Sequence, residues 1–179
     1  MENFTLCNFS VNATTQSFLA FDKILPVCPL TVFAHGEKIN LFDEMQGNQV
    51  NLSRVVNLSV ATKNTVIAGC ELAYSSVKRL SAVVAHNGVL VDIVDSCSVS
   101  PPYSPAGTVK IFKNGFTFAV LVGGDARVNF IMEKLAKKCQ AVIALEPDYR
   151  PDNEHRIKQL SALYSLPVLY ISPYRIFCC

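Results

Sequence analysis

The chain has 179 residues, of which 50% are hydrophobic and 17% are charged, and its formal net charge is +2. This length suits one domain with a sizeable core, and the scattered basic residues exclude the one-sided basic stripe that nucleic-acid binding requires. No stretch reaches the roughly 18 apolar residues of a membrane helix, and the first residues do not form a signal peptide. We therefore predict a single domain over residues 1–179 in the cytoplasm, with neither nucleic acid nor a membrane as partner.

The charged fraction is lower than the roughly 25% that is usual for soluble domains. Such a chain either covers its apolar faces internally or buries them against a partner, and we predict a homo-oligomer. The seven cysteines have no CxxC spacing, which indicates reduced, mostly buried thiols rather than a disulfide framework or a metal site. Neither a metal nor a cofactor is predicted.

The first third of the chain alternates predicted strands and helices. Alternating apolar and polar residues over 4–9 predict an opening strand, and the polar residues that follow can cap a helix that ends near Leu25. A short buried strand is predicted over 30–34. Residues 36–48 are polar and contain two glycines, which predicts a loop, and apolar residues at helical spacing predict a helix over 49–62.

The middle of the chain is rich in Val, Ile, Phe and Thr, the residues that favour strands. Asn87-Gly88 and Asn114-Gly115 lie between neighbouring runs and are typical two-residue hairpin turns. This pattern predicts antiparallel pairing. The predicted strands cover 65–69, 80–85, 89–94, 108–112 and 116–122.

The last third alternates amphipathic helices with short apolar strands. Apolar residues at helical spacing predict a helix over 128–136, and Asp152 is a candidate cap for a second helix. Strands are predicted over 141–145 and 167–171, and Cys178-Cys179 is expected to be a frayed tail. The whole order describes an α/β layer whose helices cover one face of a sheet. The other face then needs a second sheet as cover.

Three segments, in this order, resemble those of a known family. They are Leu30-Thr-Val-Phe-Ala-His35, the run from Ser81 to Ser96, and Phe118-Ala-Val-Leu-Val-Gly-Gly-Asp-Ala-Arg127. Their order and spacing resemble the carbon–nitrogen hydrolase (nitrilase/amidase) superfamily. In that family the first segment ends in a Phe-Pro-Glu motif, the second is a hairpin that ends in a lysine, and the third ends in Cys-x-Asp-x-Arg. Asp125 and Arg127 match this last motif.

The resemblance implies a nitrilase-like α-β-β-α sandwich. Family members run on through further strands beyond the position that corresponds to Cys179. The resemblance therefore implies a shortened member whose pocket wall is either incomplete or completed by a partner chain, with homo-oligomerisation as the candidate route that would complete the sandwich.

The family mechanism that the resemblance implies uses a cysteine thiolate, a glutamate base and a lysine that stabilises the tetrahedral intermediate. Carried over by position, the glutamate falls on His35, the lysine on Ser96 and the cysteine on Gly123. Glycine offers no nucleophile and serine no charge, so no catalytic residue of the family remains. The leading hypothesis is a catalytically inactive protein that acts as a binding, assembly or regulatory module, without a cofactor.

Two alternatives stay open. In the first, the nucleophile has moved to Cys97, which with His35 would form a thiol amidase that acts on non-peptide carbon–nitrogen bonds. Strand alternation argues against this alternative, because Cys97 should point away from the face that Ser96 occupies. In the second, the chain is an unrelated α/β protein that binds phosphate or another anion at Gly123-Gly124, before a helix N-terminus.

The candidate binding residues are Gly124, Asp125 and Arg127, which follow a predicted buried strand. Asp125 and Arg127 either pair with each other or order neighbouring loops, or Arg127 retains a subsite for an anion or carboxylate. The candidate ligands are therefore a small amide, a carboxylate or another anion.

Overall fold

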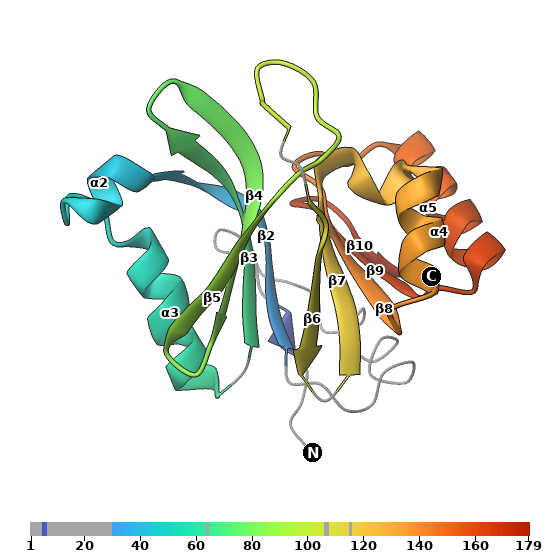
Figure 1. Ribbon diagram of the computed structural model, residues 1–179, viewed down its shortest axis with the longest axis horizontal. Helices are drawn as coiled ribbons and strands as arrows, with labels where there is room; N and C mark the ends of the chain where they lie inside the picture. The colour runs from blue at the N-terminus through green and yellow to red at the C-terminus, as the bar shows by residue number, and fades with distance from the viewer. Residues whose placement is uncertain (1–4, 7–29, 64, 106–107, 115) are drawn as a thin grey trace.

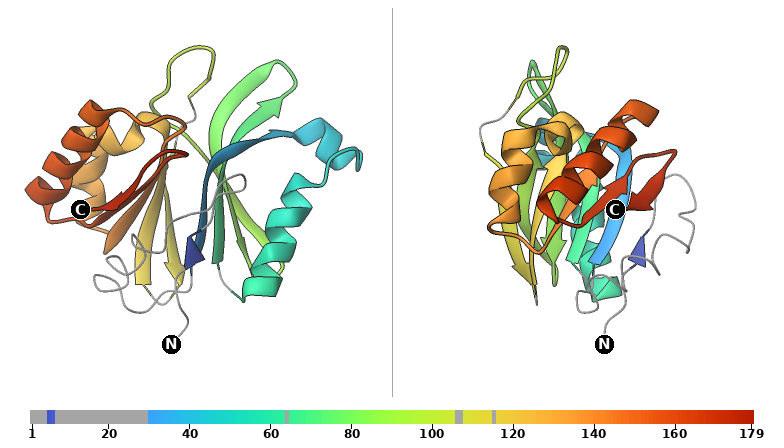
Figure 2. Two further views of the ribbon diagram at one scale, coloured as in Figure 1. Left: turned by 180° about the vertical axis from the view of Figure 1, so that it is seen from behind. Right: turned by 90° about the vertical axis from the view of Figure 1, so that its right-hand side faces the viewer.

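A computed structural model of the chain describes residues 5–6, 30–63, 65–105, 108–114 and 116–179 (Figure 1). These residues form two five-stranded sheets that pack face to face, and helices cover the outer face of each sheet (Figure 1, Figure 2). This is the predicted α-β-β-α sandwich. A single chain supplies both sheets, so the sandwich forms without strands from a second copy. The homo-oligomer stays a prediction.

The first sheet has the strand order β1-β2-β3-β4-β5. β1, β2 and β3 run parallel, whereas β3, β4 and β5 are joined by antiparallel hairpins. Asn87 and Gly88 have φ angles of 48° and 78°, the left-handed pair that the predicted two-residue turn requires. The elements of this half are β1 (Thr5–Leu6), β2 (Leu30–Asn40), α2 (Leu41–Met45), α3 (Asn51–Thr62), β3 (Thr65–Tyr74), β4 (Val77–His86) and β5 (Val89–Asp95).

The second sheet has the strand order β10-β9-β8-β7-β6. Its three central strands are parallel and are connected by helices, as the alternation of apolar runs and amphipathic segments predicts. The strands at the two edges are antiparallel to their neighbours. The elements are β6 (Lys110–Asn114), β7 (Phe116–Val122), the 3-10 helix η1 (Gly123–Arg127), α4 (Asn129–Ala136), β8 (Ala141–Leu145), α5 (Pro151–Tyr164), β9 (Val168–Ile171) and β10 (Ile176–Cys178).

Three apolar clusters hold the layers together. One lies between the two sheets and includes Ile67 and Val84 of the first sheet and Ile143 of the second, all at most 1% exposed. A second cluster lies between the second sheet and helices α4 and α5, and a third lies between the first sheet and α3. Full burial of each large aliphatic side chain contributes about 1.5–3 kcal/mol, so the interface between the sheets is a major source of stability.

Three local predictions are wrong. Residues 36–48 do not form a loop, because β2 continues to Asn40 beside β3 and is followed at once by α2. Asp152 does not cap α5, since the residue before that helix is Arg150 and no side-chain cap is formed. The C-terminus is not frayed: Cys178 pairs with Leu169, and the backbone of Cys179 exchanges two hydrogen bonds with Val168. The helix predicted to end near Leu25 falls outside the described residues.

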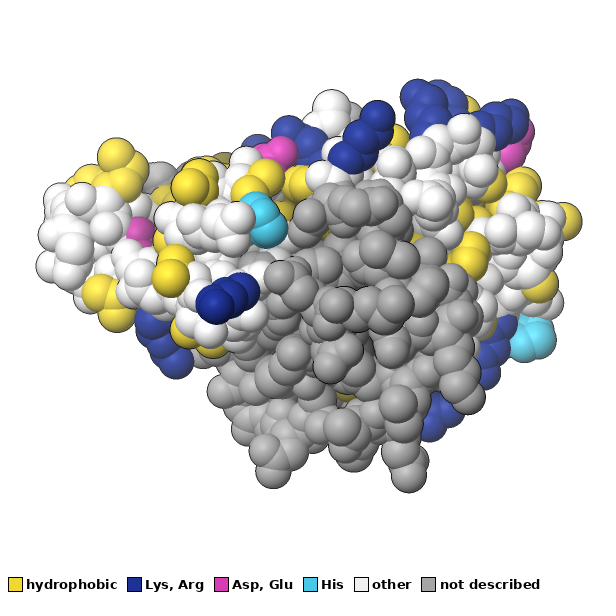
Figure 3. Space-filling view, turned by 90° about the horizontal axis from the view of Figure 1, so that it is seen from below, with side chains coloured by type: hydrophobic (Ala, Val, Ile, Leu, Met, Phe, Trp, Pro, Cys, Tyr) yellow, Lys and Arg dark blue, Asp and Glu magenta, His cyan; other side chains and the backbone are white. Residues whose placement is uncertain are grey.

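The described surface mixes apolar and charged side chains. On the face that Figure 3 shows, lysine and arginine side chains are dispersed among apolar ones rather than gathered in a single stripe. Within the part of the chain that the structure describes, no helix is both long enough and apolar enough to cross a membrane.

Candidate functional site

Two of the three positions that the resemblance assigned to the family triad lie close together. Ser96 directly follows β5, and Gly123 begins η1 directly after β7. A Cβ atom built on Gly123 would lie 3.1 Å from Ser96 Oγ and 3.3 Å from Val99 Cγ1. Gly123 also has a φ of 63°, in the left-handed region that side chains rarely adopt. The sandwich thus brings these positions together, but it leaves little space for a side chain at position 123.

His35, the third position, lies in an irregular part of β2. Phe33 pairs with Ala68 and Glu37 pairs with Cys70, so residues 34–36 of β2 face the single residue Gly69 of β3. Such a bulge redirects the side chains around it. The side chain of His35 falls outside the described part of the structure. In the sheet, β3 and β4 lie between β2 and β5, the strand that Ser96 follows.

Asp125 organises the loop that follows β5. Its carboxylate is only 1% exposed. It accepts hydrogen bonds from the hydroxyl groups of Ser96 and Ser98 at 3.1 and 2.6 Å and from the backbone N–H groups of Cys97 and Ser98 at 3.0 and 2.8 Å. A buried carboxylate with this many donors is well satisfied. Asp125 therefore orders the neighbouring loop, which was one of the predicted roles.

Asp125→Ala should lower the free energy of unfolding by about 2–4 kcal/mol, because it leaves several buried donors without an acceptor. Asp125→Asn should cost less, since the amide keeps one acceptor oxygen. Denaturant unfolding, monitored by circular dichroism, measures the free energy of unfolding of both variants. Asp152→Ala, at an exposed position in the first turn of α5, is the control and should stay within about 1 kcal/mol of the unaltered protein. Equal losses for Asp125→Ala and Asp152→Ala would contradict the role of Asp125.

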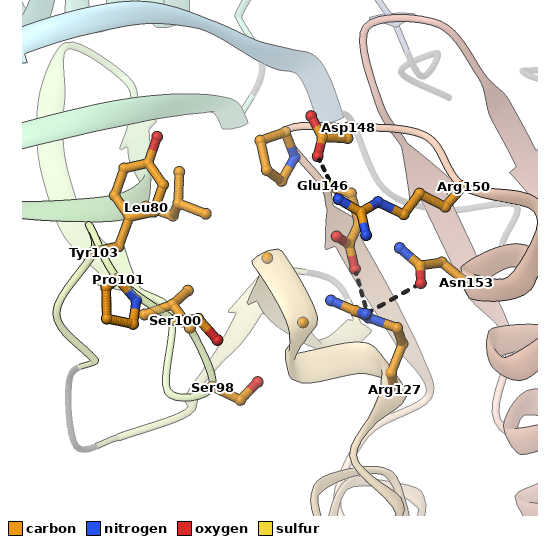
Figure 4. A pocket seen from close by; sticks show the side chains of 14 residues that line it. Leu80, Ser98, Ser100, Pro101, Tyr103, Arg127, Glu146, Asp148, Arg150 and Asn153 are labelled. Atoms are coloured by element: carbon orange, nitrogen blue, oxygen red, sulfur yellow. Dashed lines mark hydrogen bonds and ion pairs between the residues drawn. The ribbon is translucent and has the colours of Figure 1, made fainter.

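An open cavity of about 430 Å³ lies beside the two triad positions. One wall is the loop after β5, with Ser98, Val99 and Tyr103, and the facing wall is the end of β8 and the start of α5 (Figure 4). Gly123 and Gly124 form part of the lining between the walls. The volume is within the range of small-molecule sites. Ligand-sized space therefore lies next to Gly123 and Gly124.

Arg127 points into this cavity, toward the wall from β8 and α5. Its Nη1 donates to Asn153 Oδ1 at 3.1 Å, and its Nε lies 3.4 Å from Glu146 Oε1 (Figure 4). A Cβ atom at position 124 would lie 2.8 Å from Arg127 Nη2, so the glycine at 124 lets the guanidinium lie against the backbone. Arg127 does not pair with Asp125, which faces the other way, toward residues 96–98. Of the predicted binding residues, Gly124 and Arg127 line the cavity and Asp125 does not.

Glu146 is the cavity residue that sequence reasoning missed. It is 3% exposed, and its Oε1 is buried without a hydrogen-bond partner among the residues that the structure describes. Burial raises the pKa of this carboxyl group to about 8, against the opposing effect of the Arg127 cation. A carboxyl group that lines a cavity and has a strongly shifted pKa is common in functional sites. One signal in the sequence could have identified Glu146, because it is an acidic residue directly after a buried apolar strand. That strand, β8, is parallel to β7 and pairs with it, and β7 precedes Gly123.

Comparison with solved structures reveals close similarity in architecture. An amidase from Nesterenkonia sp. superimposes with a TM-score of 0.69 at 11% sequence identity, over 96% of this chain and 75% of the amidase. A carbon-nitrogen hydrolase from Helicobacter pylori G27 gives 0.64 at 11% identity, over 93% of this chain and 70% of the hydrolase. The fold is that of the nitrilase superfamily. A glutamine-dependent NAD+ synthetase from Acinetobacter baumannii gives 0.57 at 18% identity, over 88% of this chain and 33% of the synthetase. No protein-family model and no curated protein matches the sequence.

Within this nitrilase fold, Cys97 has the wrong surroundings for a nucleophile. Burial raises the pKa of its thiol, and the negative charges of Asp125 and Asp95 raise it further. A reactive cysteine needs the opposite, a positive environment that stabilises the thiolate. Cys97 is also absent from the cavity lining, whereas its neighbour Ser98 is part of it. These observations disfavour the thiol amidase alternative.

The described residues contain no group of three His, Cys, Asp or Glu side chains arranged to hold a metal ion. The polar groups that line the cavity are instead guanidinium, carboxyl, amide and hydroxyl groups. Such groups bind a ligand through hydrogen bonds and ion pairs.

Proposed function

We propose that this chain is a nitrilase-fold protein without carbon–nitrogen hydrolase activity, and that it serves as a binding or regulatory module for a small polar molecule held in the cavity beside Gly123. The main support is the contact between the two replaced positions. A Cβ atom at Gly123 would already lie 3.1 Å from Ser96 Oγ, so the place that corresponds to the attacking thiol holds no nucleophile and has little room for one.

The chemistry supports the same conclusion. Amide hydrolysis needs a nucleophile beside a base and a donor aimed at the developing oxyanion. In one variant of the amidase from Nesterenkonia sp., acrylamide has added to the active-site cysteine, and another variant of that amidase forms a complex with butyramide. Here glycine and serine occupy the positions that correspond to the cysteine and the lysine. Loss of the nucleophile alone typically lowers the rate by several orders of magnitude.

The cavity nonetheless keeps features that a binding protein needs. It joins a partly apolar wall, with Val99 and Tyr103, to a polar wall that contains Arg127, Glu146 and Asn153. The lining is mainly polar, and its charged, amide and hydroxyl groups can orient a small polar ligand through hydrogen bonds and ion pairs. This combination favours binding of a small molecule over a purely structural role for the cavity.

We expect no ammonia release above the blank when the protein is incubated with butyramide, other small amides and small nitriles. A coupled assay for ammonia measures the rate of release. The Cys97→Ala and His35→Ala variants should also show a rate at the blank level. Release from the unaltered protein that disappears in Cys97→Ala would show that the nucleophile has moved to Cys97. The binding-module proposal would then be wrong.

A further inference from the structure

The cavity contains a close pair of side chains, Arg127 and Glu146, whose ligand the proposed function leaves unnamed. Glu146, at the end of β8, and Arg127, at the end of η1, approach to 3.4 Å between Oε1 and Nε. This contact lacks the alignment of a hydrogen bond, and both atoms are buried without a hydrogen-bond partner among the described residues. Buried polar atoms that lack partners are uncommon in folded proteins and are often satisfied by a ligand or by water.

The charges around the cavity leave Arg127 available to an anion. The second guanidinium, that of Arg150, lies at the exposed rim with Asp148 Oδ2 at 3.7 Å (Figure 4). Arg127 is deeper, and its side chain is 39% exposed. Its neighbour Asn153 is neutral and accepts from Nη1, which orients the guanidinium without cancelling its charge. Glu146 cancels that charge only when it is ionised.

The site matches the shape and chemistry of a carboxylate. A guanidinium offers donors in a planar fork that fits a carboxylate, and a protonated carboxyl group can donate to a second carboxylate beside it. Pro101 and Tyr103, from the loop after β5, face this polar wall across the cavity (Figure 4). Val99 of the same loop also lines the cavity. A short hydrocarbon chain attached to the carboxylate has a surface to lie against.

We propose that the cavity binds a small monocarboxylate, whose carboxylate group contacts both the Arg127 guanidinium and the Glu146 carboxyl group from the cavity side and whose chain lies along Val99 and Tyr103. This inference rests on the proposed function and names the ligand class of the same cavity. The buried Glu146 oxygen then gains a hydrogen-bond partner, and the charge of Arg127 is neutralised by the ligand.

Binding should be linked to the protonation of Glu146. Burial raises its pKa to about 8, with further contributions from Asp125 and Asp148, while Arg127 and Arg150 act in the opposite direction. Tyr170 of β9 also interacts electrostatically with this carboxyl group. Near neutral pH the group is therefore largely protonated and can donate. Once it ionises, it repels a bound carboxylate and competes for Arg127.

The test is a calorimetric titration of the full chain with butyrate and with butyramide, at several pH values from about 6 to about 9. We expect butyrate to bind with millimolar or stronger affinity near neutral pH. Above about pH 8, the affinity should fall by up to about tenfold for each pH unit, because one proton is linked to binding. An affinity that rises with pH, or no butyrate binding by the folded protein, would overturn the carboxylate proposal.

Variants test the two groups separately. Arg127→Gln should weaken butyrate binding by about tenfold or more, and Arg127→Lys should recover part of it because the charge is kept. Glu146→Gln should still bind butyrate, but with an affinity that no longer changes with pH, since the amide donates without titrating. Arg156→Gln, at an exposed position on α5 outside the cavity, is the control and should match the unaltered protein. Thermal melts establish that each variant is folded.

The outcomes separate this inference from the proposed function. Binding of butyramide without butyrate would refute the carboxylate inference and leave the binding module standing. Ammonia release from butyramide would refute the binding module, while the butyrate titration would still decide the ligand class. Binding of inorganic phosphate in preference to butyrate would show that the cavity takes anions of another class, and it would also overturn the carboxylate proposal.

Discussion

Ile143→Asp should leave the domain unfolded at room temperature. Ile143 is 0% exposed in β8, the middle strand of the second sheet, and its side chain belongs to the cluster between the two sheets. Its neighbours in register, Val120 and Leu169, are apolar, so a carboxylate there has no partner. An unpaired buried charge costs several kcal/mol, against a total stability of about 5–15 kcal/mol for a domain.

Circular dichroism and thermal melting measure this effect. Ile111→Asp is the matched control, because it makes the same substitution on β6, an edge strand of the same sheet, at a residue that is 39% exposed. That variant should stay folded and lose at most about 1 kcal/mol of stability. A soluble Ile143→Asp protein with a cooperative melt near that of the control would mean that the sheet interface is not the main core.

Sequence patterns predicted the second sheet best. The ranges 116–122 and 141–145 match β7 and β8 because each is a continuous apolar run that both faces of a parallel sheet bury. The segment 36–48 was misread because Glu37 and Lys38 look like loop residues. β2 nevertheless continues there, since its backbone pairs with β3 whatever the polarity of the side chains. Strand pairing of this kind depends on a distant partner that local composition does not reveal.

Only part of the site could be predicted from the sequence, because most of its contacts join distant segments of the chain. The meeting of Ser96 and Gly123 followed from the resemblance, because the family places both positions at the end of neighbouring elements. The approach of Glu146 and Asn153 to Arg127 did not, because these residues lie in three separate segments that meet only after the parallel strands β7 and β8 are paired. No local motif marks such a convergence.

Glu146 should make the protein less stable as the pH rises, and Glu146→Gln should remove this effect. The pKa of Glu146 is raised from 4.5 to about 8 by burial. Below pH 4.5 the folded and unfolded chains both hold the proton. Between pH 4.5 and about 8 the unfolded chain releases it while the folded chain keeps it, so the free energy of unfolding falls with rising pH. Above about pH 8 both states are ionised and the loss is complete.

The difference in unfolding free energy between Glu146→Gln and the unaltered protein isolates this effect from all other titrating groups. It should grow by about 5 kcal/mol in favour of the variant between pH 4.5 and about 8, since each unit of pKa shift is worth about 1.4 kcal/mol. Urea unfolding at a series of pH values measures it. Glu133→Gln, where the carboxylate pairs with Lys137 on the exposed face of α4, is the control and should change stability by less than about 1 kcal/mol. A Glu146→Gln difference that does not change with pH would show that Glu146 is ionised in the folded protein. Arg127 would then be neutralised within the chain, and the cavity would lose its basis for binding a carboxylate.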